Sequence, residues 1–262
     1  MKPNEAIIIG GGASLKEGIE KDLWNRLKGK FTIGLNLSYR AFESTIQCLS
    51  DPDPYKDWLD DLKKLSLNVV RSNDKTLLYP LPNTIILPFD SEIYHRDISK
   101  GCYSNRLTGL FALSLSIYLL ECGKLYILGY DFGRLNNRKD EDGRIITHWH
   151  QNKFEHSGVG KFDWYESKSD IDNYKVGIER EDNNIEYLTG IQNRVKVFEV
   201  YKYEKRVKIY NVSLLSKINT FEKIGYDNFF NMLNDSPTYN QSELREFIKS
   251  KLKPFQIIPP KR

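Results

Sequence analysis

The sequence predicts an α/β fold built on a doubly wound, mostly parallel β-sheet. Short β-branched runs alternate along the chain with helical patterns, which is typical of βαβ winding. Most of these runs are apolar at consecutive positions, as strands covered by helices on both faces must be. The first run leads directly into the glycines Gly10, Gly11 and Gly12. We expect residues 1–262 to form a single domain.

Composition restricts the classes of protein to consider. Of the 262 residues, 40% are hydrophobic and 28% are charged, which is a globular balance. The net charge of +4 favours phosphate-bearing ligands but is too small to indicate nucleic-acid binding. Cys48, Cys102 and Cys122 form no CxxC pair, which indicates a reducing compartment. Without a signal peptide or a transmembrane segment, a cytoplasmic location is expected.

The expected strands are short and, in most cases, apolar on both faces. They cover residues 6–9, 31–35, 45–49, 67–71, 84–87, 125–128 and 206–210.

Four helices are expected between and after these strands. The first covers residues 14–27, with Ser14 as its N-cap and Glu17 completing a capping box. Residues 107–120 are apolar all round, which predicts a deeply buried helix. Apolar residues at helical spacing predict a third helix over 188–198. An amphipathic helix near the end is marked by Leu244, Phe247, Ile248 and Leu252.

Two segments fall outside the regular alternation. Residues 133–184 are polar and poor in strands but rich in aromatic residues, which favours an active-site lid over an ordinary connection. Residues from about 214 to 262 are expected to form a helical C-terminal extension that covers the sheet.

The first candidate site is the glycine turn Gly10, Gly11, Gly12, Ala13 and Ser14. Glycines let the backbone approach a ligand, and N–H groups at a strand-to-helix turn can bind an anion. The turn matches neither a complete GxGxxG motif nor a P-loop. A tight turn without a ligand remains the alternative interpretation.

Polar residues also follow the second and third expected strands. Asn36 could hydrogen-bond a sugar or a base, or it could cap a helix. Asp51 and Asp53 could hold Mg²⁺ on a diphosphate or accept from a ribose. The proline-rich sequence around these carboxylates is equally compatible with an ordinary turn.

The strongest local pattern is Gly129 and Asp131 at the exit of an apolar strand. A carboxylate at such a place fits a ligand cleft at the carboxyl end of a parallel sheet. Thr108 and Gly109 interrupt an apolar helix near its start, where a hydroxyl and bare backbone could meet a ligand. Close packing of helices is the alternative interpretation for Gly109.

His148 and His150 lie on the expected lid. Residues two apart share a face only in an extended strand, and either histidine could act as a general base. A zinc site would need further ligands, and no cysteine lies nearby, so zinc is disfavoured.

Together these residues resemble a known superfamily. The chain is similar to the Rossmann-like domain shared by 6-hydroxymethylpterin diphosphokinase-like proteins and bacterial lipooligosaccharide sialyltransferases. The matching segments are residues 8–16, Asn36, residues 50–52, Thr108 with Gly109, residues 128–131, and residues 209–213 with Phe221.

The resemblance implies that the glycine turn holds a nucleotide, with its base or sugar near Asn36, Thr108 and Gly109. It also implies that His148 or His150 acts as the catalytic base. The chain departs from the sialyltransferase pattern, which usually has asparagine at the position of Gly11 and proline at that of Ala13. The tyrosines expected beyond Asp131 are also missing.

We therefore expect a nucleotide-dependent transferase, first of all a sialyltransferase-like glycosyltransferase with a nucleotide-sugar donor and a hydroxyl acceptor. One alternative is a diphosphokinase-like enzyme that uses ATP and Mg²⁺, with Asp51 and Asp131 around the metal. Another is a non-catalytic protein that binds a nucleotide sugar. The sequence leaves homo-oligomerisation open.

Overall fold

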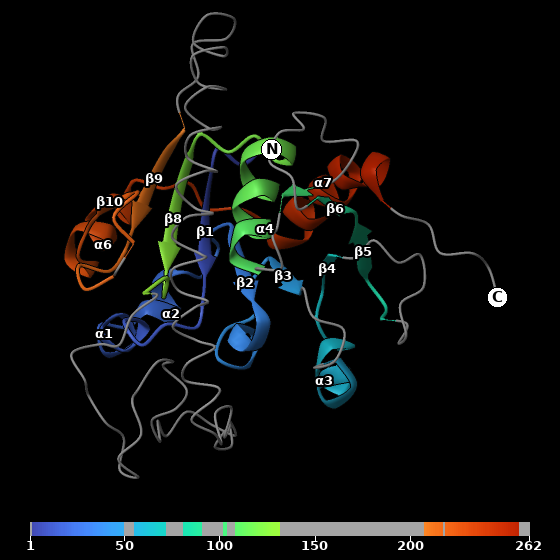
Figure 1. Cartoon of the computed structure of the whole chain (residues 1–262), viewed down its shortest axis with the longest axis horizontal. Coiled ribbons are helices and arrows are strands. Elements are labelled where there is room, and N and C mark those ends of the chain that lie inside the picture. Colours follow the sequence, from blue (N-terminus) through green and yellow to red (C-terminus); the bar gives the residue numbers. More distant parts are fainter. Residues whose placement is uncertain are drawn as a thin grey trace, which may run out of the picture. The chain divides into compact units, whose positions relative to one another are not determined.

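Eight strands form one parallel sheet, which confirms the predicted α/β class. The structure, a computed structural model shown in Figure 1, describes residues 2–49, 55–71, 81–90, 102–103, 108–131, 207–216 and 218–256. The strands are β1 (Glu5–Ile9), β2 (Thr32–Leu35), β3 (Ile46–Leu49), β4 (Asn68–Arg71), β5 (Thr84–Leu87), β8 (Lys124–Leu128), β9 (Lys208–Asn211) and β10 (Glu222–Lys223). A separate two-stranded sheet pairs β6 (Phe89–Asp90) with β7 (Cys102–Tyr103).

The order of the strands shows where the winding reverses. Across the sheet the strands follow the order β10-β9-β8-β1-β2-β3-β4-β5. The chain thus runs outward from β1 through β2, β3, β4 and β5, and then returns to β8 on the other side of β1. This reversal between β1 and β8 is the arrangement expected of a doubly wound sheet.

The chain divides into two compact units, and we describe each by itself. Unit 1 comprises Met1–Ile8, Gly29–Leu125 and Pro237–Arg262, and unit 2 comprises Ile9–Lys28 and Tyr126–Ser236. The single-domain organisation and the limits expected for the lid and the extension stay predictions.

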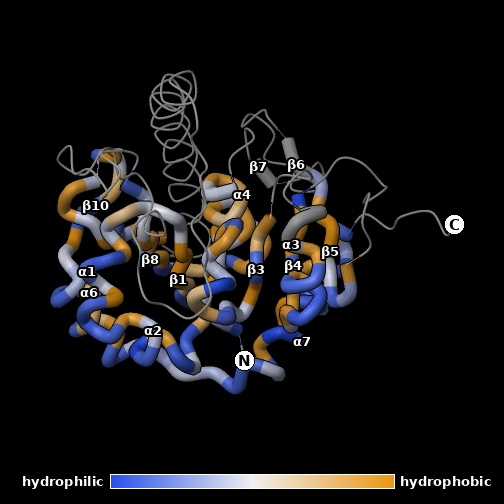
Figure 2. Tube along the Cα trace, turned by 90° about the horizontal axis from the view of Figure 1, so that it is seen from below, coloured by the Kyte–Doolittle hydropathy of each residue, from blue (hydrophilic) through white to orange (hydrophobic). Residues whose placement is uncertain are grey.

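In unit 1 the helical segments are η1 (Asn36–Arg40), α3 (Tyr55–Leu62), α4 (Thr108–Ser114), η3 (Leu115–Leu119), α7 (Gln241–Leu252) and η5 (Lys253–Phe255). Helix α4 packs against β2 and β3. Figure 2 shows hydrophobic residues along β3 and α4, and it shows α4 and α7 on opposite sides of β3 and β4. Helices therefore cover both faces of this part of the sheet.

The buried helix expected over residues 107–120 is present with a change of geometry. All residues of α4 are buried, but the segment continues as η3, a π-helix. There the Ser116 hydroxyl donates to the Ala112 carbonyl oxygen at 2.7 Å, and the Ser116 carbonyl accepts from the Cys122 N–H at 2.9 Å. The wide turn thus keeps polar groups bonded inside an apolar segment.

In unit 2 the helices are α1 (Leu15–Glu20), α2 (Leu23–Arg26) and α6 (Tyr226–Asn234). The prediction of one continuous helix over residues 14–27 is wrong. Asp22 has φ +65°, a left-handed conformation that ends α1 before α2 begins. Helix α1 lies against α6, because a Cβ on Gly18 would come within 2.3 Å of the Tyr226 ring.

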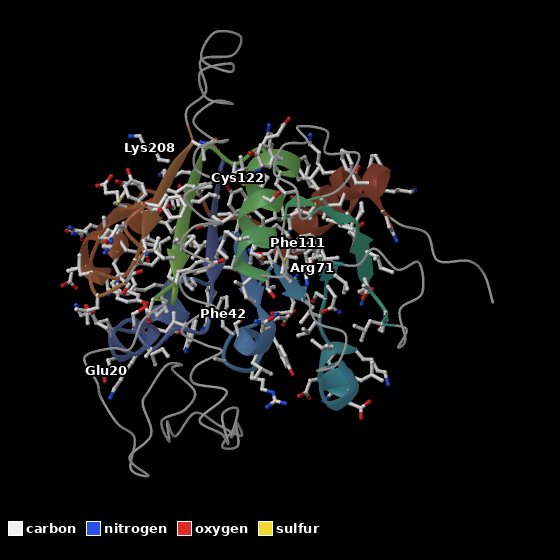
Figure 3. All side chains as sticks on the ribbon, viewed as in Figure 1. Glu20, Phe42, Arg71, Phe111, Cys122 and Lys208 are labelled. Atoms are coloured by element: carbon white, nitrogen blue, oxygen red, sulfur yellow. The ribbon has the colours of Figure 1, made fainter. Side chains whose placement is uncertain are left out.

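Each unit has its own buried apolar residues. In unit 1, Phe111 and Cys122, both labelled in Figure 3, are almost completely buried. In unit 2, the ring of Tyr126 on β8 stacks on Tyr210 of β9 at 5.6 Å and meets the edge of Phe229 of α6 at 5.1 Å. Aromatic side chains therefore join two strands to a helix in unit 2.

The remaining predictions concern the C-terminal helix, residues 133–198 and membrane-spanning helices. The predicted amphipathic helix near the end is confirmed as α7, which buries Leu244, Ile248 and Leu252. The lid over residues 133–184 and the helix over residues 188–198 lie outside the described residues. Within the described ranges, no helix is long and apolar enough to cross a membrane.

Candidate functional site

The glycine turn after β1 is closed onto the turn after β8, within unit 2. The Gly10 N–H donates to the Leu128 carbonyl oxygen, and the Gly12 N–H donates to the Gly129 carbonyl oxygen, both at 2.8 Å. A Cβ on Gly12 would lie 2.5 Å from that same Gly129 oxygen. Gly129 itself has φ +68°, a conformation that favours glycine. Glycine is therefore required on both sides of this contact.

Asp131 binds the same turn through its carboxylate. Its Oδ2 atom accepts a hydrogen bond from the Ser14 N–H at 2.7 Å, and its side chain is only 2% exposed. A carboxylate at the start of a helix satisfies an N–H group that has no partner within the helix. Ser14 stands at the N-cap of α1, as predicted, but its side chain makes no capping hydrogen bond.

The second carboxylate oxygen, Asp131 Oδ1, lies in a buried polar environment. At ordinary hydrogen-bond geometry it has no partner among the described residues, and neither do the hydroxyls of Ser14, Ser213 and Tyr226, although the two serine hydroxyls lie close enough to Asp131 to influence its pKa. Burial raises the pKa of Asp131, while the hydroxyl and N–H of Ser14 and the hydroxyl of Ser213 oppose that rise. Burial raises the pKa of Tyr226 as well, and the negative charge of Asp131 adds to this effect.

The remaining residues of the turn differ in exposure. Ala13 is buried, whereas Gly11 is half-buried. The Gly11 N–H donates no hydrogen bond within the described part of the chain. Gly11 therefore offers a backbone donor that the closure of the turn does not use.

A second group of predicted residues meets in unit 1. The Thr108 hydroxyl donates to Asn36 Oδ1 at 3.1 Å. Asn36 is exposed, while Thr108 is buried at the first position of α4. The helix-capping alternative for Asn36 is not observed, since η1 begins at Asn36 itself and has no side-chain cap. Gly109 is buried in α4, as its close-packing alternative requires.

Sequence reasoning missed one residue of this group. The Gln47 side chain on β3 donates from Nε2 to the Asn36 carbonyl oxygen at 2.9 Å. Gln47 stands between Ile46 and Cys48 in a strand that is buried throughout. A polar residue in such a strand needs a buried hydrogen-bond partner, and this was the signal that could have found it.

The other predicted site residues cannot be placed. Asp51, Asp53, His148 and His150 lie outside the described residues. Within the described ranges, no group of His, Cys, Asp or Glu side chains could hold a metal ion. The metal and base assignments therefore stay predictions.

Comparisons of the chain with protein-family models, with curated proteins and with solved structures found no match. The superfamily thus rests on the resemblance of short motifs alone.

Proposed function

We propose that the protein is a nucleotide-dependent transferase whose donor is a nucleotide sugar. The observation that carries the proposal is the place of the glycine turn and of Gly129–Asp131 in the strand order. They follow β1 and β8, the neighbouring strands between which the winding reverses. Ligands of open α/β sheets bind outside the carboxyl ends of the strands at such a reversal.

The chemistry of the turn supports a phosphate-bearing donor. The bare faces of Gly10 and Gly12 are filled by the turn after β8, so Gly11, which is half-buried, is the glycine whose backbone a ligand can approach. The Gly11 N–H is a donor without a partner among the described residues. In this proposal Asp131 holds the turn in shape through Ser14 and does not touch the donor.

The environment of Asp131 supports sugar transfer over phosphoryl transfer as the proposed reaction. A diphosphokinase-like reaction needs its carboxylate beside Mg²⁺, yet that carboxylate is buried and accepts from the Ser14 N–H. Sugar transfer makes no such demand on Asp131. We therefore place the glycosyltransferase first and keep phosphoryl transfer as the alternative outcome of the tests.

Binding is tested by thermal shift with CMP, CDP, UDP, GDP, ADP, ATP and CMP-sialic acid, each with and without Mg²⁺. A ligand that binds only the folded state at a hundredfold excess over its Kd stabilises that state by about 2.7 kcal/mol. A metal-independent shift with a cytidine or uridine nucleotide supports the proposal. A shift only with ATP and Mg²⁺ favours phosphoryl transfer, and no shift at all overturns nucleotide binding.

Two glycine substitutions locate the site within unit 2. Gly12→Ala places a Cβ against Gly129 O and Asp131 and should abolish the shift. Gly225→Ala is the matched control, because its Cβ would meet only Leu214 at an ordinary 3.5 Å. Equal shifts in wild type and in a folded Gly12→Ala variant would place the nucleotide elsewhere.

The proposed base is tested by turnover of the donor that binds. The resemblance assigns the base to His148 or His150. We expect alanine at the true base to lower the rate on the order of 10²-fold, with binding retained. No loss in either variant contradicts this role, and binding without turnover of any donor supports the non-catalytic alternative.

A further inference from the structure

Gln47 is a buried polar residue in an apolar strand, and its side chain is directed to a single backbone group. It is 2% exposed and lies on β3 opposite Gly34 of β2 in the parallel register. From there its Nε2 reaches the carbonyl oxygen of Asn36, which lies two residues beyond Gly34.

Gly34 has no side chain, which leaves room for the Gln47 side chain to extend to the Asn36 carbonyl oxygen. A Cβ at position 34 would lie 2.6 Å from Gln47 Oε1, and 2.5 and 2.8 Å from the hydroxyl oxygens of Ser38 and Ser44. Any side chain at Gly34 would therefore displace Gln47. Gly34 and Gln47 together form a support beneath Asn36.

Asn36 is held in a conformation that costs free energy. Its φ is +51°, in the left-handed region that residues other than glycine enter rarely, although asparagine enters it more readily than most. Gln47 binds its main-chain carbonyl, and Thr108 binds its side-chain oxygen. Strained conformations of this kind persist when several neighbouring contacts determine them.

The Thr108 contact also fixes what Asn36 can offer to a ligand. Asn36 Oδ1 already accepts from the Thr108 hydroxyl, so the amide nitrogen Nδ2 remains, with hydrogens to donate. No hydrogen bond from Nδ2 to a described residue is present, and the residue is exposed. The Asn36 side-chain NH₂ group is therefore available to donate a hydrogen bond to an acceptor atom of a ligand.

We propose that Gln47 is a positioning residue that holds the left-handed backbone of Asn36, so that the Asn36 amide donates a hydrogen bond to a carbonyl oxygen of a nucleotide base. The inference rests on the proposed function for the identity of the ligand. It adds a residue that touches no ligand and gives Asn36 the role of donor.

The test replaces Gln47 by methionine, which has a similar length but no N–H to donate. Two readouts are compared with those of wild type: the NMR signals of the Asn36 backbone and side-chain NH₂ group, and the Kd for the best-binding nucleotide of the panel. We expect Gln47→Met to move the Asn36 signals and to weaken binding about tenfold, the effect of one lost hydrogen bond.

Gln241→Met is the matched control. Gln241 donates to the Lys30 carbonyl oxygen at 3.1 Å and accepts from the Thr45 hydroxyl at 2.7 Å. Its loss removes a comparable hydrogen bond to backbone within unit 1, but it should leave the Asn36 signals and the Kd unchanged. Unmoved Asn36 signals in Gln47→Met, or equal weakening by Gln241→Met, would overturn the proposal.

A second variant separates conformation from contact. Asn36→Gly adopts positive φ freely but has no side-chain amide to donate. It should weaken nucleotide binding at least as much as Gln47→Met, and adding Gln47→Met to it should cause no further loss. Further loss in the double variant would show that Gln47 acts independently of Asn36.

Failure of the proposed function is recognised separately. A wild-type protein that binds none of the nucleotides overturns that function and the donor role of Asn36. The Asn36 signals in Gln47→Met and Gln241→Met then decide the positioning role alone. Cytidine, tested beside inorganic pyrophosphate, distinguishes recognition of the base from recognition of phosphate.

Discussion

At the scale of single residues, Asp131 illustrates how far sequence reasoning reaches. Its place after an apolar strand, between glycines, identified it as a residue of the site. In the structure its carboxylate accepts a hydrogen bond from the Ser14 N–H, a contact that the sequence did not predict. Sequence shows that a carboxylate follows a strand, but the path of the backbone beyond the strand decides what it faces.

Burial gives Asp131 an effect on stability that depends on pH. Its pKa is raised from 3.8 in the folded protein, so folding favours the protonated form. This contribution to the free energy of unfolding is complete below pH 3.8 and is lost as pH rises through the raised pKa. The side-chain amide introduced by Asp131→Asn would still accept from the Ser14 N–H, but without a charge. We expect this variant to gain stability relative to wild type as the pH rises above 3.8.

Urea denaturation of both proteins at pH values below and above 3.8 measures the effect. Asp235→Asn, the same change at an exposed position, controls for net charge. Parallel stability profiles for wild type and Asp131→Asn would contradict the assignment of a buried, destabilised carboxylate.

At the scale of elements, strands were easier to predict than helix ends. The runs around β1, β5 and β8 were predicted to within a residue because they are apolar on both faces. The break between α1 and α2 was missed, because it depends on the backbone of Asp22, which no periodicity reveals. Strand β10 has only the residues Glu222 and Lys223, too few for a pattern.

Helix α7 has the side-chain cap that α1 lacks. Asn240 accepts from the N–H groups of Ser242 and Glu243 at 3.0 and 3.3 Å. Asn240→Ala should therefore lower the free energy of unfolding by about 1 kcal/mol, measured by urea denaturation. Asn234→Ala, at an exposed helical position of α6, should change it by only a few tenths. Equal effects of the two substitutions would contradict the role of Asn240 as the cap of α7.

At the scale of the molecule, the sheet class followed from the alternation of strands and helices. The order of the strands could not be predicted, because a short apolar run does not show which other strand it pairs with. The reversal between β1 and β8 thus became visible only in the structure. The meeting of Asn36 with Thr108, which lie 72 residues apart, was expected from the resemblance to the superfamily and not from the local patterns.

The buried thiols offer a measure of unfolding for unit 1. Cys48 and Cys122 are buried, and burial raises the pKa of Cys122 to about 12. Because thiolate is the reactive form, neither thiol should react with a disulfide reagent until the structure opens. In a Cys102→Ser variant, the labelling rate should rise with urea in parallel with unfolding. Rapid labelling in the native state would contradict this burial.

The hydrogen bonds of α7 also determine when the protein can finish folding during its synthesis. Gln241 binds Thr45 and the Lys30 carbonyl across 196 and 211 residues, and the Tyr239 N–H donates to the Gly29 carbonyl oxygen. Residues 29–45 are synthesised early, but their hydrogen-bond partners at residues 239–241 are synthesised late. Contacts between residues this distant in sequence slow folding. Until residues 239–241 emerge, the hydrogen-bonding groups of Gly29, Lys30 and Thr45 lack these partners.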